Sequence, residues 1–478
     1  MGDFGDTLGM SLEITEELIA RQTPEAQAII RLLLGQIEEL TARVAALEAR
    51  LGKSPQNSSL PPASQHPHAK PPARKPKSKK KRGGQPGHKK HQRPLLPSGD
   101  CDDIRIIKPA ECRRCGEKLS GRDFQPLRHQ VWELPEIKPT ITEYQRHRLC
   151  CRRCGTSSCA ELPSGVPTGQ AGPRLVALTA LLMGCFRQSK SRVAVFLEQV
   201  LDQPCSTGWV VKLQNQATAA LRPAYDELAA RLPAEPILGI DETPTKEATR
   251  KSWLWTFVAP RLTVFSVRDS REATALTDML GSSFDGVVNC DRAKMYWLLP
   301  KLQWCWAHLK RDFQALIDTG DPQAKRLGHE LMPCVRELFR LWARSRDGTL
   351  KRVGWLRLMR PIREKVDALL LRGAYSGNKR LVGMCNELTK HGDWLWTFLE
   401  VEGVEPTNNA SERALRHPVI WRKLSFGTQS PRGSRFVETI LTVIETCRQQ
   451  SRAVFGYLTT AIQAHYAARP APSLLPGA

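Results

Sequence analysis

The sequence lacks the features that would direct it to a membrane or into the secretory route. Its longest markedly apolar run, residues 175–186, is too short to span a bilayer and is expected to form a buried helix. The first ten residues contain neither the basic stretch nor the apolar stretch of a secretory signal. We therefore expect a cytoplasmic protein with no membrane contact, whose 14 Cys residues are not joined in disulfides.

Acidic residues are also scarce. The chain has 48 Asp and Glu residues against 71 Lys and Arg residues, which gives a formal net charge of +23. A positive charge of this size predicts a polyanionic partner, of which nucleic acid is the most common. With 478 residues, 41% of them hydrophobic, the chain is long enough for two to four domains with sizeable cores.

Residues 24–51 have the apolar periodicity of a helix with a single hydrophobic seam. Spacings of three and four residues alternate over three heptads, as in a coiled coil. The pattern predicts a short coiled coil through which the chain forms a homo-oligomer. A helix that packs on its own domain is the alternative, since three heptads are few for a coiled coil. The seam consists of Ile30, Leu33, Ile37, Leu40, Val44, Leu47 and Leu51.

Residues 51–99 contain 12 Lys or Arg residues and 10 Pro residues but no Asp or Glu. A segment of this composition cannot bury enough apolar surface to fold alone. We interpret residues 52–99 as a basic arm that contacts nucleic-acid phosphates, with a solvated linker as the alternative. The densest positive charge of the arm lies at Lys79, Lys80, Lys81 and Arg82.

The sequence Cys-Arg-Arg-Cys-Gly occurs twice in the segment 100–165, at residues 112–116 and 151–155. In each copy a tight turn would direct two thiolates to one point, and two such turns supply the four ligands of a structural zinc ion. Residues 124–150 are expected to form a two-stranded hairpin that brings the turns together. A redox-active pair is the weaker alternative. The predicted Zn²⁺ ligands are Cys112, Cys115, Cys151 and Cys154.

Residues 168–232 are predicted to be helical. Within them, residues 189–217 have a helix-turn-helix pattern of the kind found in DNA-binding proteins. Ordinary packing of helices explains the pattern equally well, so DNA contact and helix packing both remain open here.

From residue 233 onwards, strands and helices alternate. Their expected order is strand, strand, strand, helix, strand, helix, strand, helix, which is that of a ribonuclease-H-like α/β fold with a mixed sheet. The chain is mostly helical and basic between about residues 320 and 403. We therefore interpret residues 233–465 as this α/β domain with a helical insertion, followed by a tail at 466–478.

Two acids follow strands of the predicted sheet. Asp241 follows the first strand and Asp291 the fourth, and these strands are neighbours in the predicted topology. Paired carboxylates are suitable ligands for Mg²⁺ or Mn²⁺, and two such ions activate a water or a 3′-hydroxyl at a phosphodiester. Three other acids compete with this assignment. Asp269 and Asp285 are expected at turns, and Glu242 points away from Asp241 if the strand continues.

A third carboxylate is expected from a later helix, and Glu412 is the leading candidate. Asn408 and Asn409 are expected to cap its helix. The alternative is an ordinary surface helix with an ion pair between Glu412 and Arg416. If the helix serves the site, its basic residues face DNA phosphates: Arg413, Arg416, Arg422 and Lys423.

Four blocks of this chain resemble the signature blocks of the insertion-sequence 66 family of DDE transposases: GIDETP, CDRAKMYW, CWAHLKRDF and NNASERALRHPVIWRK. NSSLPP, GGQPGHKKH and the paired CRRCG turns also match the N-terminal half of that family. The resemblance covers roughly residues 25–465, and the order of the blocks makes it specific. It implies that Asp241, Asp291 and Glu412 are the catalytic acids, with two Mg²⁺ or Mn²⁺ ions per active site.

The resemblance further implies an enzyme that cuts double-stranded DNA at the ends of a mobile element and joins the freed 3′-hydroxyl to target DNA. Such an enzyme would be associated with the nucleoid and could need accessory proteins of the same element. The residues alone leave two alternatives, a non-catalytic zinc-containing DNA-binding protein and a ribonuclease-H-like nuclease that does not join DNA. His308, in the block CWAHLKRDF, is expected to be a packed structural residue rather than a contact of DNA or of a metal-bound water.

Overall fold

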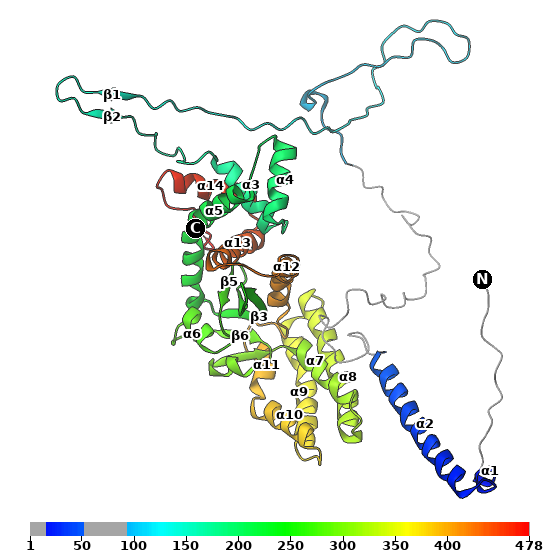
Figure 1. The fold of residues 1–478 in the computed structure, drawn as a ribbon. Helices are drawn as coiled ribbons and strands as arrows, with labels where there is room; N and C mark the ends of the chain where they lie inside the picture. Colours follow the sequence, from blue (N-terminus) through cyan, green and yellow to red (C-terminus); the bar gives the residue numbers. More distant parts are fainter. Residues whose placement is uncertain (1–15, 52–92, 478) are drawn as a thin grey trace. The chain divides into compact units, whose positions relative to one another are not determined.

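The computed structural model describes residues 16–51 and 93–477 (Figure 1). Contacts divide the described residues into a larger unit, residues 16–51, 146–193 and 206–477, and a smaller unit, residues 93–145 and 194–205. The predicted cationic cluster at residues 79–82 lies outside the described residues. None of the described helices is long and apolar enough to cross a membrane.

The N-terminal region is helical, as predicted. α1 (Glu16–Ala20) precedes α2 (Pro24–Leu51), which begins with Pro, a residue whose missing N–H costs no hydrogen bond at that position. The side chains of the predicted seam are exposed to solvent along much of α2. The seam residues that are at least half exposed are Leu33, Ile37, Leu40, Val44 and Leu47. The coiled coil itself stays a prediction.

The hairpin predicted within residues 124–150 is wrong. Residues 121–147 contain no strand, and β1 (Arg148–Cys150) pairs instead with β2 (Ser157–Cys159) across the second Cys turn. A two-stranded hairpin is marginal unless its apolar face is covered. Here the apolar side chains of Phe124 and Ile141 are 84% and 90% exposed, so no packing holds two strands together. Before this segment lies one short 3-10 helix, η2 (Ser98–Asp100).

A five-stranded mixed sheet forms the centre of the larger unit, as predicted. β3 is antiparallel to β4, and β4 to β5, whereas β6 and β7 run parallel to β3. α6 (Thr274–Leu280) connects β5 to β6, and the short 3-10 helix η4 (Lys294–Leu298) stands in place of the second expected helix. The spatial order is β5 (Thr263–Arg268), β4 (Arg250–Val258), β3 (Ile237–Glu247), β6 (Val287–Cys290) and β7 (Lys301–Trp304).

Helices cover the sheet on the side of edge strand β5. Backbone N–H groups of this strand donate to hydroxyl oxygens on α13, Phe265 to Thr442 at 2.9 Å and Thr263 to Thr446 at 3.1 Å. These side chains satisfy an edge that would otherwise be open for pairing. The helices are α3 (Pro173–Gly184), α5 (Thr207–Arg231), η3 (Leu232–Ala234), α13 (Pro431–Gln449) and α14 (Val454–Tyr466). α4 (Lys190–Leu201) lies mostly in the smaller unit.

α5 packs against α3, α13 and α14, and it also contacts β5. Its buried side chains include Val210, Leu213 and Leu221. This packing accounts for the apolar pattern of α5, while DNA contact by residues 189–217 stays a prediction. The chain end packs nearby, since Leu474 is buried and Ser473 donates a hydrogen bond to Glu227 at 2.8 Å.

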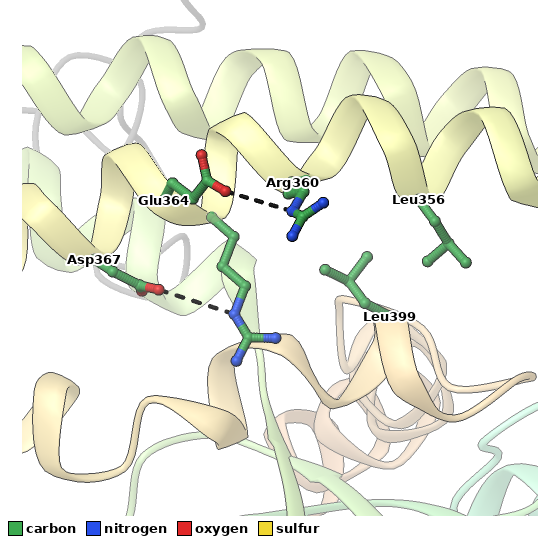
Figure 2. Close-up of a pocket in the computed structure, with 6 residues that line it drawn as sticks. Leu356, Arg360, Glu364, Asp367 and Leu399 are labelled. Carbon is green, nitrogen blue, oxygen red and sulfur yellow. Dashed lines mark ion pairs between the residues drawn. The ribbon is translucent and has the colours of Figure 1, made fainter.

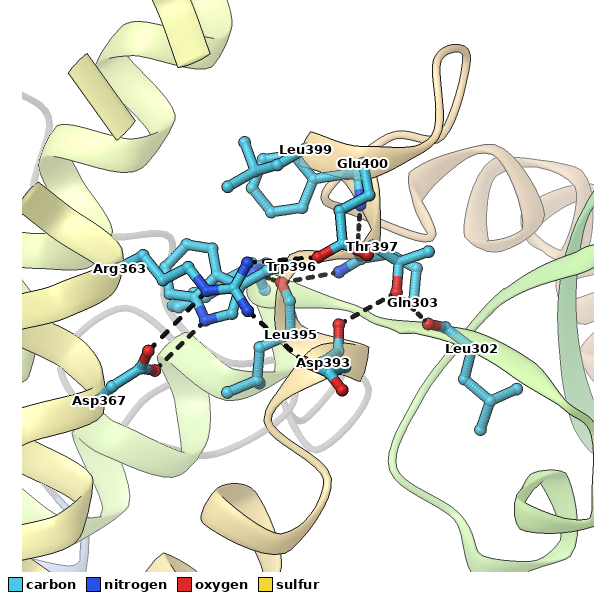
Figure 3. Close-up of polar contacts among 12 residues, drawn as sticks. Leu302, Gln303, Arg363, Asp367, Asp393, Leu395, Trp396, Thr397, Leu399 and Glu400 are labelled. Atoms are coloured by element: carbon cyan, nitrogen blue, oxygen red, sulfur yellow. Dashed lines mark hydrogen bonds and ion pairs between the residues drawn. The ribbon is translucent and has the colours of Figure 1, made fainter. Parts of the chain in front are cut away.

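The opposite edge strand, β7, is covered by the helical insertion. The Gln303 side chain donates to the Leu395 carbonyl at 3.2 Å and accepts from the Phe398 N–H at 2.8 Å, which fixes α11 along β7 (Figure 3). Thr397 also donates to the Leu302 carbonyl at 2.6 Å. The helices of this part are α7 (Trp306–Ile317), α8 (Pro322–Arg346), α9 (Arg352–Ala374), α10 (Lys379–Lys390) and α11 (Asp393–Glu400).

A single guanidinium ties α9 to α11. Arg363 pairs with Asp367, Asp393 and Glu400 at 3.9, 3.5 and 3.3 Å (Figure 3). Arg363 also lines a cavity of about 440 Å³. Figure 2 shows Arg360, Glu364 and Asp367, which line it as well. Arg360 in its wall pairs with Glu364 at 3.5 Å, so the cavity has matched charges and no excess charge to attract a ligand.

Candidate active site

Asp241 and Asp291 lie at equivalent distances from a paired position of two neighbouring parallel strands. β3 and β6 pair Gly239 with Asn289. Asp241 is two residues farther along β3, and Asp291 is two residues farther along the chain, directly after β6 ends at Cys290. Side chains two residues apart share a face of the sheet, so the register directs both carboxylates to the same edge. The expectation that β3 ends at Asp241 is wrong. β3 continues to Glu247 because its pairing with β4 extends beyond the end of β6.

Glu412 reaches this edge on α12 (Asn409–Ser425), which packs on β3 and β4. The segment before the helix is held by buried hydrogen bonds. Asn289 on β6 donates to the carbonyls of Glu405 and Thr407 at 3.0 and 3.3 Å. Asn408 donates its side-chain N–H to the Ile240 carbonyl on β3 at 2.7 Å. The start of α12 is therefore fixed to β3, which carries Asp241, and to β6, which ends directly before Asp291.

The predicted Asn cap of α12 is wrong. Asn408 occupies the N-cap position, but its side chain forms no capping hydrogen bond. Its amide instead satisfies the Ile240 carbonyl, and its backbone N–H donates to the Cys305 sulfur at 3.2 Å. Tertiary contacts have replaced the local cap.

Gly239 permits the close approach of α12 to β3. A Cβ atom at this position would lie 2.5 Å from the Ser411 Oγ and 2.9 Å from the Asn408 Oδ1. Real Cβ atoms do not come this close to other heavy atoms. The glycine in the block GIDETP therefore sets the position of Ser411 and, one residue later, of Glu412.

The acids of this edge are electrostatically coupled. Burial, together with the negative charges of Glu242, Asp291 and Glu412, raises the pKa of Asp241 to about 8, against the opposing effect of a hydrogen bond from the Glu242 N–H. Glu412 is 40% exposed in its side chain, and its Oε1 lacks a hydrogen-bond partner. Among ion pairs of the described residues, the alternative Glu412–Arg416 pair does not occur.

Glu242 is part of the site, although strand alternation predicted that its side chain points away from Asp241. Its carboxylate accepts hydrogen bonds from the Tyr296 hydroxyl and, at 2.6 Å, from the Arg271 guanidinium. Arg271 also lies 3.8 Å from Asp291. Burial raises the pKa of Glu242, and the hydrogen bond from Tyr296 opposes this rise. Tyr296 lies in the same sequence block as Asp291, and this was the only sequence feature that could have linked Glu242 to the site. Strand alternation alone does not reveal the contact between Tyr296 and Glu242.

His308 lies beside Glu412, and its expected role as a packed structural residue stays a prediction. Its Nδ1 is 3.6 Å from the Glu412 Oε1, and both buried atoms lack a hydrogen-bond partner. Burial and the charge of Arg311 lower the pKa of His308, against the effect of Glu412, so the imidazole is neutral at pH 7.

Cys305 joins His308 and Glu412 in one cluster. Ligand atoms of the three residues lie within 4.8 Å of one another, the one such group of His, Cys, Asp or Glu among the described residues. Burial raises the pKa of the Cys305 thiol, whose sulfur accepts the Asn408 N–H. Because a thiolate is the metal-binding form, this Cys is better suited to hold α12 than to bind an ion.

α12 also presents the predicted DNA-binding cations. Arg413, Arg416 and Lys423 are exposed. Arg422 is half-buried and donates to the Thr243 hydroxyl at 3.1 Å. None of these four residues pairs with an acid in the described parts of the chain, so their charge is available to an anionic partner.

The two Cys turns have the same local geometry. In each, the first Cys N–H donates across the turn at 2.8 Å, to Glu117 or Thr156. Gly116 and Gly155 have φ of 73° and 71°, a left-handed conformation that favours glycine. A hydrogen bond from the Arg114 backbone lowers the pKa of Cys112, which favours its thiolate. The turns belong to different units, so the four-ligand zinc site stays a prediction.

Comparison with known proteins gives two family matches and two relatives. A model described as "Transposase IS66 family" matches residues 168–435, and one described as "Family of unknown function (DUF6444)" matches residues 16–94. The uncharacterized protein y4hP of Sinorhizobium fredii (strain NBRC 101917 / NGR234) is 25% identical over 73% of this chain and 70% of its own length. Protein y4qI of the same strain, also uncharacterized, is 26% identical over 71% of this chain and 67% of its own length.

Proposed function

Because the chain belongs to the IS66 family of transposases, we propose that it cuts double-stranded DNA at the ends of a mobile element and joins the freed 3′-hydroxyl to target DNA. The observation that carries this proposal is the register that directs Asp241 and Asp291 to one edge of the sheet, where hydrogen bonds from Asn289 and Asn408 anchor the start of the helix that bears Glu412. The strand order β5-β4-β3-β6-β7 supports a ribonuclease-H-like core around these acids.

The chemistry of the acids suits a divalent metal ion of the Mg²⁺ or Mn²⁺ type, although in the described residues the ligand atoms of Asp241, Asp291 and Glu412 do not all lie within 4.8 Å of one another. The carboxyl of Asp241 is desolvated, and in the described residues it forms no ion pair, while the Glu412 Oε1 is an unsatisfied buried oxygen. Hard oxygen ligands of this kind are those that Mg²⁺ prefers. Asp241, Asp291 and Glu412 would hold two such ions, which supply activation of an oxygen nucleophile and stabilisation of the leaving oxygen at the phosphodiester.

The neighbouring side chains would orient these ligands. Arg271 links Glu242 to Asp291, so it holds the second acid near its place and limits the repulsion between carboxylates. The neutral imidazole of His308 lies at the Glu412 carboxylate and would restrict its rotation. The exposed cations of α12 would bind DNA phosphates and position the strand at the acids.

Other parts of the chain would support assembly on DNA. The open apolar seam of α2 is suited to a homo-oligomeric coiled coil. A structural Zn²⁺ on the four Cys residues would join the two turns. The basic arm of residues 52–99 would add phosphate contacts, and accessory proteins of the same element remain expected partners. A DNA substrate of this kind places the protein in the cytoplasm, at the nucleoid.

A strand-transfer assay with precut transposon ends and Mg²⁺ tests the proposal. Wild-type protein should join the 3′ ends to target DNA, and Glu412→Gln and Asp241→Ala should each lower the rate by about 1000-fold or more, since metal-ligand interactions supply several kcal/mol. Glu402→Gln, at an exposed residue before α12, is the matched control and should keep full activity.

The two alternatives give different results in this assay. Cleavage of intact ends without joining of precut ends would identify a nuclease. If wild type and Asp241→Ala have equal activity, or if neither shows metal-dependent cleavage, the protein is a non-catalytic DNA-binding protein.

A further inference from the structure

A second cavity, of about 690 Å³, lies within the larger unit beside the candidate active site. Residues of α5, β3, β4, β5, α12 and α13 line it, together with the end of α3, the turn before α4 and the loop 426–430. Its apolar floor consists of buried side chains, none more than 8% exposed: Met183, Leu254, Trp421 and Phe436. Its volume lies within the range of about 300–1,000 Å³ that small-ligand sites occupy.

The charge of this cavity is of one sign. None of its lining residues, all of them described, is Asp or Glu, whereas Lys190, Arg422 and Arg432 line it. Arg422 is half-buried and donates to a single neutral partner, the Thr243 hydroxyl. A partly buried cation without a counter-ion is costly, and an anionic ligand would offset that cost. The cavity of Figure 2 differs in this respect, because its acids and cations are paired.

Amide groups and Ser and Thr hydroxyls supply the other polar surface. Gln214 on α5 lines the cavity and is 3% exposed as a residue. Asn215 and Gln188 also line the cavity. An amide presents one acceptor and two donors, the groups that pair with the edge of a nucleobase. The Gln214 amide beside an apolar floor therefore favours a flat, polar-edged ligand.

The wall of the cavity is fixed before any ligand binds. Thr428 donates its N–H to the Lys246 carbonyl at 2.9 Å, and the Ala248 N–H donates to the Thr428 carbonyl at 2.7 Å. Gly427 has φ of 97°, and a Cβ there would lie 2.5 Å from the Lys246 carbonyl oxygen. The loop after α12 is thus held against the far end of β3, which lowers the ordering cost of binding.

The same two elements connect this cavity to the acids. Thr243 is two residues after Asp241 on β3, which corresponds to about 7 Å along a strand. Arg422 is ten residues after Glu412 on α12, about 15 Å along a helix. Four base-pair steps of DNA cover about the same length. A DNA strand bound at the acids therefore reaches the cavity within a few nucleotides.

We propose that this cavity binds one unpaired nucleotide of the DNA substrate, with its base against the apolar floor and the Gln214 amide and its phosphate at Arg422. The choice of DNA as ligand rests on the proposed function. An unstacked base would be held a few nucleotides from the phosphodiester that reacts, so the cavity would favour ends that carry or readily form an unpaired position.

The test compares two DNA duplexes bound by the full chain without added Mg²⁺, so that no cleavage occurs. One duplex is fully paired, and the other has the same sequence with a single unpaired nucleotide. Fluorescence anisotropy at one fixed salt concentration gives both affinities. Wild-type protein should prefer the second duplex by about 5-fold or more, as expected for the insertion of one base at an aromatic site.

Arg422→Met and Gln214→Leu should each reduce this preference to nearly one. Arg435→Met is the control, because Arg435 is an exposed cation of α13 that does not line the cavity. It should weaken both duplexes equally and keep the preference. Thermal unfolding of each variant verifies that it is folded.

Equal binding of both duplexes by wild type, or a preference that persists in both cavity variants, would overturn the proposal. The variant Asp241→Ala shows whether binding at the cavity depends on the catalytic acids. If Asp241→Ala still prefers the duplex with the unpaired nucleotide, the cavity binds DNA independently of the acids. A wild-type protein that shows the preference but cleaves no DNA would overturn the proposed function alone.

Discussion

The acidic edge of the sheet and the paired Cys turns are both marked by short motifs, but different interactions hold them. At the edge, buried hydrogen bonds from Asn289 and Asn408 join three segments that are far apart in the sequence. In the segment that contains the first Cys turn, local backbone hydrogen bonds close the turn itself, and Gln130 donates to the Leu96 carbonyl at 3.0 Å and to the Cys101 sulfur at 3.2 Å. Large apolar side chains of this segment, such as Ile141, are nevertheless exposed. One site is built by the packing of a core, whereas the other has its turns and a few polar contacts but no apolar core.

This difference indicates two ways of forming a metal site. A site on a packed sheet has its ligands in place before the ion binds. A site on local turns gains its tertiary structure from the ion, as small zinc modules do. The predictions below test this comparison, beginning with the largest expected effect.

Loss of zinc should separate the two regions most strongly. The double variant Cys112→Ser and Cys151→Ser should lose one Zn²⁺ per chain, and with it a binding free energy on the order of 10 kcal/mol. Residues 100–165 should then become sensitive to limited proteolysis, while the sheet with its helices stays resistant. Zinc content and protease fragments are measured together, with Cys101→Ser as control. Unchanged zinc content in the double variant would disprove the four-ligand site.

Gly239→Ala should disturb the edge by steric overlap. The new Cβ would meet the Ser411 Oγ at 2.5 Å, so α12 must shift away from β3 at a cost of up to about 3 kcal/mol. Urea unfolding and strand transfer should both be impaired. Adding Ser411→Ala removes the closest contact and should restore part of the stability. The control is Gly383→Ala on α10, where a Cβ meets no atom within 4 Å. Equal stability of both glycine variants would contradict the packing argument.

Asn408→Ala should have a smaller effect at the same place. It leaves the Ile240 carbonyl without its buried donor, which costs about 1–2 kcal/mol of unfolding free energy. Strand transfer should fall as well, because α12 loses its attachment to β3. Asn409→Ala, one residue later at the start of α12, lacks this contact and is the matched control. If both Ala variants unfold at the same urea concentration, Asn408 does not anchor the helix.

The smallest effect is expected from pH. His417 on α12 lies 2.7 Å from the Gly184 carbonyl and 2.8 Å from Arg187. Burial lowers its pKa, with the charges of Arg187 and Arg448 acting in the same direction and the Gly184 carbonyl opposing them. A lowered His pKa means that the unfolded chain binds the proton more strongly. The stability present above the ordinary His pKa is therefore lost as the pH falls below it.

The loss between pH 7 and pH 5 should be less than about 1 kcal/mol once solvent screening is considered. His417→Gln should flatten this part of the pH profile of the unfolding temperature. His465→Gln, at an exposed position of α14, is the control. A profile that is identical in wild type and His417→Gln would show that this His does not contribute.

Much of the fold follows from local patterns. Alternation and apolar runs predict the five strands, and helical periodicity predicts α2 and the helices of the insertion, because these signals depend on residues close in sequence. The errors arise where distant segments decide. β3 runs past Asp241 because β4 pairs with it, and Asn408 gives up its capping role because the Ile240 carbonyl is nearby.

The site shows the same division. The types of Asp241, Asp291 and Glu412 and their positions after strands or on a helix were predictable from sequence. The inclusion of Glu242 was not, since it depends on Tyr296 and Arg271, which approach from two other segments. Likewise, the contact between His308 and Glu412 exists only because α7 and α12 begin side by side, joined by the hydrogen bond from Asn408 to Cys305.

The sequence by itself determined the excess of positive charge, the acids and their order along the chain, the turn-forming Cys pairs and the periods of the strands and helices. These properties are local or compositional, and they do not require knowledge of which segments touch. The tertiary structure decided how close the acids lie and which of them raise the pKa of one another. It also decided where a cavity without acidic residues opens beside them. Each of these depends on burial and on distances between segments far apart in sequence, and both arise only when the sheet and its helices pack together.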